Sequence, residues 1–219
     1  MLPDLTAIEA RIIGSLIEKS IITPDQYPMT LNALTAACNQ KSSREPVMNL
    51  NQGEVQRTLR NLEARHLVMA DENFRSRVEK YRHRFCNTRY SDLQFSDAEL
   101  AIVCLLLLRG AQTAGELRAR SGRLHAFADN DEVVTALEGL MRRTEPVVVK
   151  LPRRAGRRDA EFMHVFAGPV DVEAAEEAAA AAKPAGRATP SVADLAARIE
   201  TLEAEMARLR ALVEGNTPG

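Results

Sequence analysis

The sequence predicts a mainly α-helical α+β fold with small β-hairpins, arranged as two copies of one unit and followed by a separate C-terminal helix. Three observations support this prediction. Helix-start signatures are followed by short segments of β-type alternation, this order of elements occurs twice, and apolar residues near the C-terminus repeat with heptad spacing. A chain of 219 residues is long enough for two domains of about 80–100 residues each.

The first copy, residues 1–90, is predicted to contain three helices. Each begins after a residue whose side chain can accept a hydrogen bond from the first helical turn, namely Thr6, Thr30 or Asn51. Apolar residues at helical spacing follow each of these positions. A segment with two prolines, residues 23–28, separates the first helix from the second because proline cannot continue a helix.

A β-hairpin is predicted after the third helix, where the period of the apolar residues changes. Residues 67–70 form a short apolar run, residues 71–73 form a polar corner, and residues 78–85 alternate. Tyr81 then lies on one face of the strand and Arg82 on the other. The unit is therefore three helices followed by a hairpin.

The same order recurs in residues 91–169. The three helices of this second copy are predicted to start at Ser96, Thr113 and Asp131. Its two strands are predicted at residues 147–151 and 161–166. Superposing the helices of the two copies in turn gives offsets of 90, 83 and 78 residues. The offset falls because the loops of the second copy are shorter, as expected for two versions of one unit.

Three short helices followed by a hairpin resemble the winged-helix form of the helix-turn-helix. In that fold the third helix enters the major groove of DNA and the loop of the hairpin, the wing, contacts the backbone. The resemblance implies two tandem winged-helix domains, residues 1–90 and 91–169.

Several motifs carry a closer resemblance. They are TPDQYP at residues 23–28, LNALTAACNQK at 31–41, REPVM at 44–48, LLLLRG at 105–110, GELR at 115–118 and LPR at 151–153. Over roughly residues 5–169 the chain resembles the YceH-like family of bacterial proteins. This resemblance implies a tandem winged-helix fold in a family without an established biochemical function, so function must be argued from the residues.

The net charge of −1 combines a basic body with an acidic tail. Residues 1–170 contain 24 Lys and Arg against 21 Asp and Glu, whereas residues 171–219 contain five against nine. Two stretches are strongly basic: 57–89 with nine basic residues against four acidic ones, and 142–158 with seven against one. Such stretches are typical of surfaces that contact phosphate, although solvated protein faces also carry them.

The third helix of the first copy is the predicted DNA-recognition helix. When its apolar residues face the core, the side chains on and beside its outer face are Gln56, Arg57, Arg60 and Asn61. Arginine can bind guanine, and glutamine or asparagine can bind adenine, through two hydrogen bonds. The predicted phosphate contacts of the wings are Arg75, Arg77, Arg153, Arg154, Arg157 and Arg158.

The third helix of the second copy has a different outer face, which includes Asp131 and Glu138. Carboxylates repel phosphate, so this copy is expected to contact DNA through its wing alone, or to form a dimer or partner surface. The polar residues 39–44 lie between the second and third helices of the first copy. They either contact phosphate or bond to the backbone within turns.

The sequence does not predict an enzyme or a bound cofactor. The four histidines are dispersed, no metal-ligand spacing or nucleotide-binding glycine motif is present, and Cys38 has no histidine base beside it in sequence. His83 and His164 are predicted to be packing residues in apolar strands. The aromatic content of 4%, without tryptophan, argues against a stacking platform for single-stranded nucleic acid.

A cytoplasmic location and no contact with a membrane are expected. The three cysteines are far apart and odd in number, which argues against a disulfide framework. The longest apolar run, residues 100–108, is about half the length that crosses a bilayer. The first residues also lack the basic region of a secretion signal.

The tail is predicted to be an Ala/Glu-rich linker, residues 170–190, followed by a heptad helix, residues 191–214. The expected dimerisation residues are Leu195, Ile199, Leu202, Met206 and Leu209. Their 4, 3, 4, 3 spacing predicts a short parallel coiled coil, and the flanking charges are complementary between chains. The alternative is an amphipathic helix that packs on its own body.

Two functions fit these patterns. The first is a homodimeric protein that binds double-stranded DNA, a transcriptional regulator that uses the third helix of the first copy and the basic wings. The alternative is a protein-interaction module, since tandem winged helices also occur in chromosome-segregation subunits that bind partner proteins.

Overall fold

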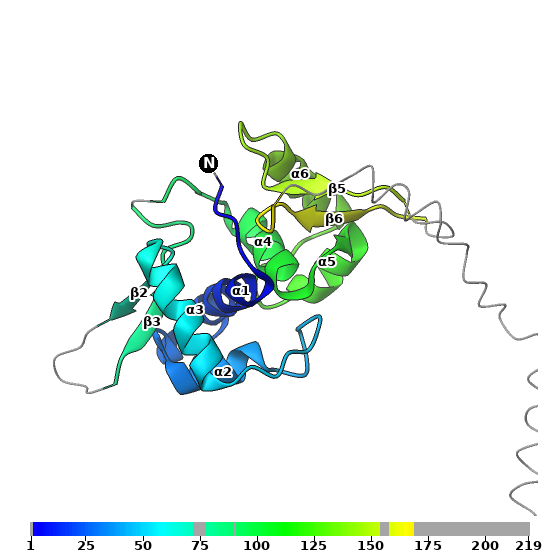
Figure 1. Ribbon diagram of the computed structural model, residues 1–219. Helices are drawn as coiled ribbons and strands as arrows, with labels where there is room; N and C mark the ends of the chain where they lie inside the picture. The colour runs from blue at the N-terminus through cyan, green and yellow to red at the C-terminus, as the bar shows by residue number, and fades with distance from the viewer. Residues whose placement is uncertain (1, 72–77, 90, 154–157, 169–219) are drawn as a thin grey trace, which may run out of the picture. The chain divides into compact units, whose positions relative to one another are not determined.

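The computed structural model describes residues 2–71, 78–89, 91–153 and 158–168, all of which belong to one compact unit, Met1–Ala181. These residues form six α-helices and two three-stranded antiparallel sheets (Figure 1). The mixed α and β composition agrees with the prediction. The linker 170–190 and the heptad helix 191–214 lie outside the described residues.

In the first half, three helices accompany one sheet. The elements in chain order are α1 (Ala7–Ile22), β1 (Met29–Thr30), α2 (Leu31–Cys38), α3 (Gln52–Ala64), β2 (Val68–Asp71) and β3 (Lys80–His83), with a short 3₁₀ helix at Pro24–Gln26. The strand order is β1-β3-β2, so β3 lies in the middle. Val68 of β2 pairs with His83 of β3.

The second half repeats this arrangement. Its elements are α4 (Asp97–Arg109), β4 (Gln112–Thr113), α5 (Ala114–Ser121), α6 (Asn130–Met141), β5 (Val148–Lys150) and β6 (Glu161–His164). The strand order is β4-β6-β5, with β6 in the middle. Val148 of β5 pairs with His164 of β6, which matches the pairing of Val68 with His83.

The predicted helix starts are confirmed, with one shift. Thr6, Thr30, Asn51, Ser96 and Thr113 are the N-cap residues of α1 to α5, and each side chain accepts a hydrogen bond from the third residue of its helix. The last helix, α6, begins slightly earlier than predicted. Its N-cap is Asp129, whose side chain accepts a hydrogen bond from the backbone N–H of Glu132 at 2.9 Å. Local capping chemistry therefore determines where the helices begin.

The hairpin prediction missed the third strand of each sheet. Met29–Thr30 pairs with Tyr81 and Lys80, and Gln112–Thr113 pairs with β6. Each strand has two residues and ends at the N-cap of the next helix. Such a short strand has no period for a sequence pattern to detect.

The halves share one hydrophobic core, in which α1 packs against α4. Gly14 permits this approach: a Cβ atom at this position would lie 3.0 Å from Leu108 Cγ and 3.1 Å from Leu107 Cβ. The helix α4 also contacts α5, α6 and β6, so all eight residues from 101 to 108 are buried. The close contact of α1 with α4 joins the two repeats into a single packed body.

Candidate nucleic-acid interface

The outer face of α3 has the predicted composition. Its inner face consists of Val55, Leu59 and Leu62, which have no exposed surface. Arg57, Arg60 and Asn61 are exposed, and Gln56 is half-buried. The packing of the three apolar side chains therefore directs the four candidate side chains to one side of the molecule.

The carboxylates of α3 do not neutralise its arginines. Glu54 accepts a hydrogen bond from the backbone N–H of Asn51 at 2.8 Å, as part of the N-terminal cap. Glu63 Oε1 accepts from the backbone N–H of Ala70 at 2.9 Å. Within the described ranges, neither Arg57 nor Arg60 forms an ion pair, so both guanidinium groups are available to an anionic ligand.

The N-terminus of α2 lies beside this surface. Gln52 Nε2 donates to Asn32 Oδ1 at 3.1 Å, and both residues are exposed. This hydrogen bond joins the first turns of α2 and α3, which are the two helices of the helix-turn-helix arrangement expected from the sequence. The two helices also pack directly against each other.

Two further arginines of the basic stretch 57–89 form ion pairs within the protein. Arg65 Nη1 binds Glu9 Oε1 of α1 at 2.9 Å, and Arg82 forms an ion pair with Asp71 across the β2–β3 hairpin. These arginines hold elements together. The charges of Arg65 and Arg82 are therefore paired within the protein.

The polar segment 39–44 is one candidate for phosphate contacts beside α3, but two of its side chains bond within the protein instead. Arg44 is buried: its Nη1 and Nη2 atoms donate to the two carboxylate oxygens of Glu18 at 3.0 and 2.6 Å. Asn39 exchanges two hydrogen bonds of 2.8 Å with the backbone of Leu50. The suggestion that Arg44 contacts phosphate is wrong, and Asn39 has the alternative, turn-forming role.

The Arg44–Glu18 pair also determines the charge state of Glu18. Burial alone would raise the pKa of this carboxyl group, but the hydrogen bonds and charge of Arg44, together with Lys19, lower it below its ordinary value. Glu18 is therefore a carboxylate at neutral pH. Nothing in the sequence pattern signals this pair, because its members are 26 residues apart.

Only part of the predicted wing surface is described. Arg153 and Arg158, on either side of the second wing, are exposed. Arg75, Arg77, Arg154 and Arg157 lie outside the described residues, as do the dimerisation residues Leu195, Ile199, Leu202, Met206 and Leu209. The described portion of the candidate interface therefore consists of α3, the start of α2 and the two arginines that flank the second wing.

The corresponding helix of the second half, α6, is acidic. Asp131 is exposed, and Glu138 forms an ion pair of 2.7 Å with Arg142 on the next turn. Glu132 accepts a hydrogen bond from the backbone N–H of Ala128 at 2.7 Å and contacts His125 at 3.0 Å. This helix presents no unpaired arginine on its outer face.

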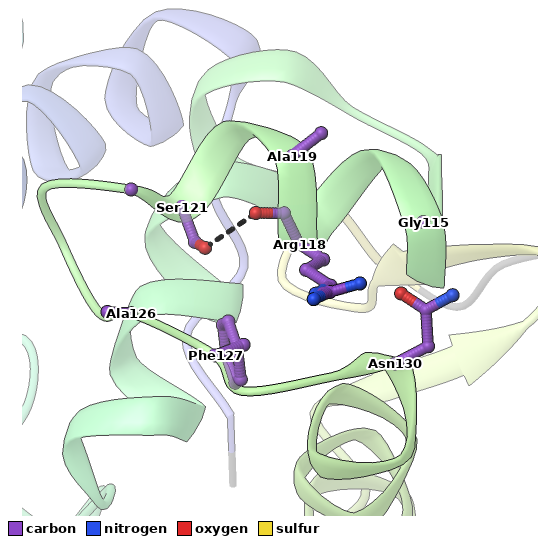
Figure 2. A pocket seen from close by; sticks show the side chains of 8 residues that line it. Gly115, Arg118, Ala119, Ser121, Ala126, Phe127 and Asn130 are labelled. Carbon is purple, nitrogen blue, oxygen red and sulfur yellow. Dashed lines mark hydrogen bonds between the residues drawn. The ribbon is translucent and has the colours of Figure 1, made fainter.

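A pocket of about 530 Å³ lies between α5 and the segment that leads to α6 (Figure 2). Small residues, including Gly115 and Ala119, form part of its wall, and Figure 2 shows Ser121 bonded to the backbone of Arg118. Arg118 Nη2 donates to the carbonyl of Ala128 at 2.8 Å. The lining contains no carboxylate, histidine or cysteine, so it offers no pair of groups for acid–base chemistry.

Cys38, Cys86 and His164 are buried and His83 is half-buried, whereas His125 is half-buried and His66 is exposed. Burial lowers the pKa of His83 and of His164 to about 4, in keeping with their predicted packing role. Burial also raises the pKa of Cys38 to about 11 and of Cys86 to about 12, which leaves them as thiols at neutral pH. Across the described ranges, no group of three or more His, Cys, Asp or Glu residues could hold a metal ion.

None of the described helices is both long and apolar enough to cross a bilayer. This finding concerns only the helices within the compact unit.

Comparisons with known proteins show the family. Residues 5–157 match the family described as "Protein of unknown function, DUF480". A UPF0502 protein of Vibrio atlanticus (strain LGP32) is 50% identical over 211 residues, which cover 96% of this chain and 97% of the relative. A UPF0502 protein of Enterobacter sp. (strain 638) is 51% identical over 207 residues, covering 94% and 93%. The chain therefore belongs to the DUF480/UPF0502 family of uncharacterised bacterial proteins, consistent with its resemblance to the YceH-like family.

Proposed function

We propose that this protein binds double-stranded DNA as a transcriptional regulator, with each half acting as a winged-helix domain. The observation that carries the proposal is the outer face of α3, where Arg57 and Arg60 are exposed while both carboxylates of the helix are engaged elsewhere. A recognition helix needs such a face, because phosphate and base edges must meet unpaired donors.

In this proposal α3 enters the major groove. Arg57 and Arg60 bind phosphate or guanine, and Gln56 and Asn61 supply amide groups that can bind adenine. The basic wings contact the backbone, Arg75 and Arg77 in the first half and the arginines of residues 153–158 in the second. Backbone contacts give affinity that depends on salt, whereas the amide contacts give sequence preference.

The proposal includes a homodimer. The heptad residues of the tail would pair two chains in a parallel coiled coil and bring two copies of α3 to one DNA site. Light scattering of the full chain, compared with a chain in which Leu202 and Leu209 are changed to Lys, tests this part. A monomer in both cases contradicts it. The proposal assigns no catalytic reaction and no cofactor, and places the protein with DNA in the cytoplasm.

The main test is a fluorescence-anisotropy titration of labelled duplex DNA. The unmodified chain should bind, with an affinity that falls as salt rises. The double variant Arg57→Ala/Arg60→Ala should bind more weakly, with a salt slope reduced by about one for each lost phosphate contact. Arg118→Ala is the matched control, because Arg118 is exposed, lies on α5 and belongs to neither basic stretch. Absence of binding by the unmodified chain at about 50 mM salt contradicts the proposal.

A second candidate function is supported by the outer face of α6, where Asp131 is exposed and Val134 is a 38% exposed apolar residue. Such a face suits a protein partner better than DNA. Affinity capture from cell extract with nuclease present separates the two functions. A partner retained by the unmodified chain and lost with Asp131→Lys/Val134→Asp supports the interaction module, whereas a partner that disappears on digestion was held by DNA.

A further inference from the structure

A cavity of about 210 Å³ lies where α1, α4 and α5 meet, on a different set of elements from the outer face of α3. Its wall combines apolar side chains, Ile22, Leu105, Leu108 and Leu124, with the side chains of Glu18 and Ser43 and three arginines. The arginines are Arg109, Arg120 and Arg123. A cavity that combines apolar walls with several guanidinium groups has the composition of a site for an organic anion.

Arg109 is the unusual member of this group. Its Nε atom is buried and has no hydrogen-bond partner, and within the described part of the chain its guanidinium forms no ion pair. Burial lowers the pKa of Arg109, and the positive charges of Arg120 and Arg44 lower it further, against the opposing effect of Glu45 and Glu18. A partly buried cation beside other cations is unfavourable unless an anion binds it.

The carboxylates near the cavity are already used. Glu18 binds Arg44 through both oxygens and Lys19 Nζ at 3.1 Å. Glu116 binds Arg120 at 3.4 Å and accepts the backbone N–H of Thr113 in the cap of α5.

Glu45 is exposed, and its backbone N–H donates to the carbonyl of Leu108 at 2.9 Å. Its carboxylate lies too far from Arg109 for an ion pair within the described ranges. Arg123 is exposed and likewise has no ion-pair partner among the described residues. Among the described residues, Arg109 and Arg123 on the cavity wall therefore form no ion pair, and Glu45 and Glu18 act on Arg109 only at longer range.

We propose that this cavity is a binding site for a small organic anion, one whose carboxylate or phosphoryl group is held by Arg109 and Arg123 and whose apolar part contacts Leu105 and Leu124. Because the wall takes residues from α1 of the first half and from α4 and α5 of the second, the bound anion contacts both halves. The inference does not depend on DNA binding and is tested on protein without DNA.

The test measures the melting temperature of the full chain, and the heat of binding by calorimetry, with two probes at constant ionic strength. Inorganic phosphate represents the phosphoryl group and succinate the carboxylate. At least one probe should raise the melting temperature of the unmodified chain in a saturable way, as expected for a ligand that binds only the folded state. The probe that binds identifies which of the two groups the site prefers.

Arg109→Gln removes the charge and keeps a polar, although shorter, side chain. The variant should bind the probe about ten- to hundredfold more weakly, the effect of losing a charge-assisted hydrogen bond. In anion-free buffer its melting temperature should be unchanged or higher, since repulsion from Arg120 and Arg44 is relieved. Arg142→Gln changes an exposed arginine at the C-terminal cap of α6, far in sequence from the cavity wall; it is the control and should bind like the unmodified chain.

Two results from the first comparison overturn the proposal, and a third comes from a second variant. One is the absence of saturable binding of either probe to the unmodified chain up to about 10 mM, and the other is equal binding by Arg109→Gln and the unmodified chain. A structural role for Arg109 would instead lower the melting temperature in anion-free buffer. In that case Arg123→Gln, which changes an exposed side chain, repeats the comparison, and equal binding by this variant overturns the proposal as well.

Discussion

The helices α3 and α6 have equivalent buried faces and opposite outer faces. Val55, Leu59 and Leu62 of α3 correspond, at the constant offset of 78 residues, to Val133, Leu137 and Leu140 of α6, and all six are fully buried. On the outside, the same offset places Thr135 opposite Arg57 and Glu138 opposite Arg60. The core restricts one face of each helix, while the other face has diverged.

The loops that precede these helices differ as well. In the first half the longer loop brings the buried side chain of Arg44 to Glu18 of α1. In the second half the position that corresponds to Glu18, at an offset of 90 residues, is Leu108. The comparison teaches that one half is held by a buried ion pair at a site where the other half has an apolar side chain.

The largest expected effect concerns this ion pair. Arg44→Leu leaves Glu18 buried with only Lys19 as a partner, and should lower the free energy of unfolding by about 3–5 kcal/mol. The double variant Glu18→Leu/Arg44→Leu copies the apolar character of the second half and should recover most of that loss. A double-mutant cycle checks this by denaturant unfolding of Arg44→Leu, Glu18→Leu and the double variant. Additive losses would show that the two side chains do not interact.

The next effect exchanges the outer faces of the two helices. Arg60→Glu gives α3 the residue that α6 has at the corresponding position, and should weaken binding to duplex DNA about ten- to hundredfold at low salt, through loss of one cation and gain of one anion. Glu138→Arg makes the opposite change on α6 and should not weaken binding. Anisotropy titrations of both variants measure the difference. If Arg60→Glu bound DNA with the same affinity as the unmodified chain, α3 would not be part of the interface.

A smaller effect comes from a feature that the halves share, the buried histidines His83 and His164. The folded chain binds protons at these sites only near pH 4, whereas the unfolded chain binds them near pH 6.5. Stability is therefore fully present above pH 6.5 and is lost as the pH falls through this window. Between pH 7 and 6 the two sites together should lower the free energy of unfolding by about 1 kcal/mol.

Glutamine at both histidine positions should flatten this pH dependence. Burial lowers the pKa of both histidines to about 4, so His83→Gln and His164→Gln should each remove about half of it. Urea unfolding of the single and double variants at several pH values measures these shares. A pH dependence that persists unchanged in the double variant would assign it to other groups.

The smallest effect concerns the ion pair between Glu138 and Arg142. Their side chains are 43% and 78% exposed, in contrast to the buried Arg44–Glu18 pair. Arg142→Ala should change the free energy of unfolding by less than about 0.5 kcal/mol, and the change should vanish in high salt. Urea unfolding at low and high salt provides the measurement. A loss near that of Arg44→Leu would contradict the assigned difference between the two pairs.

The parts of the fold that local chemistry determines could be predicted from the sequence. Thr6 and Ser96 begin helices because their side chains satisfy backbone donors a few residues away. The outer face of α3 follows from helical periodicity once the apolar face is assigned. These interactions link residues that are close in sequence.

Long-range partners could not be predicted. The burial of Arg44 depends on Glu18 in another helix, and the strand at Met29–Thr30 depends on β3, about 50 residues later. The position of Arg109 on a cavity wall, without an ion pair among the described residues, becomes visible only when three helices meet. A local sequence pattern identifies a side chain but does not reveal which distant residues surround it.

The close contact between α1 and α4 has a consequence for experiments that divide the chain. A fragment that ends near residue 90 loses the partner of α1, and a fragment that begins there exposes an uninterrupted apolar surface on α4 to water. Both fragments would aggregate or unfold, and a loss of activity in either would report that failure rather than the position of a binding surface. Point substitutions on exposed residues of the intact chain are therefore the way to locate function in this family.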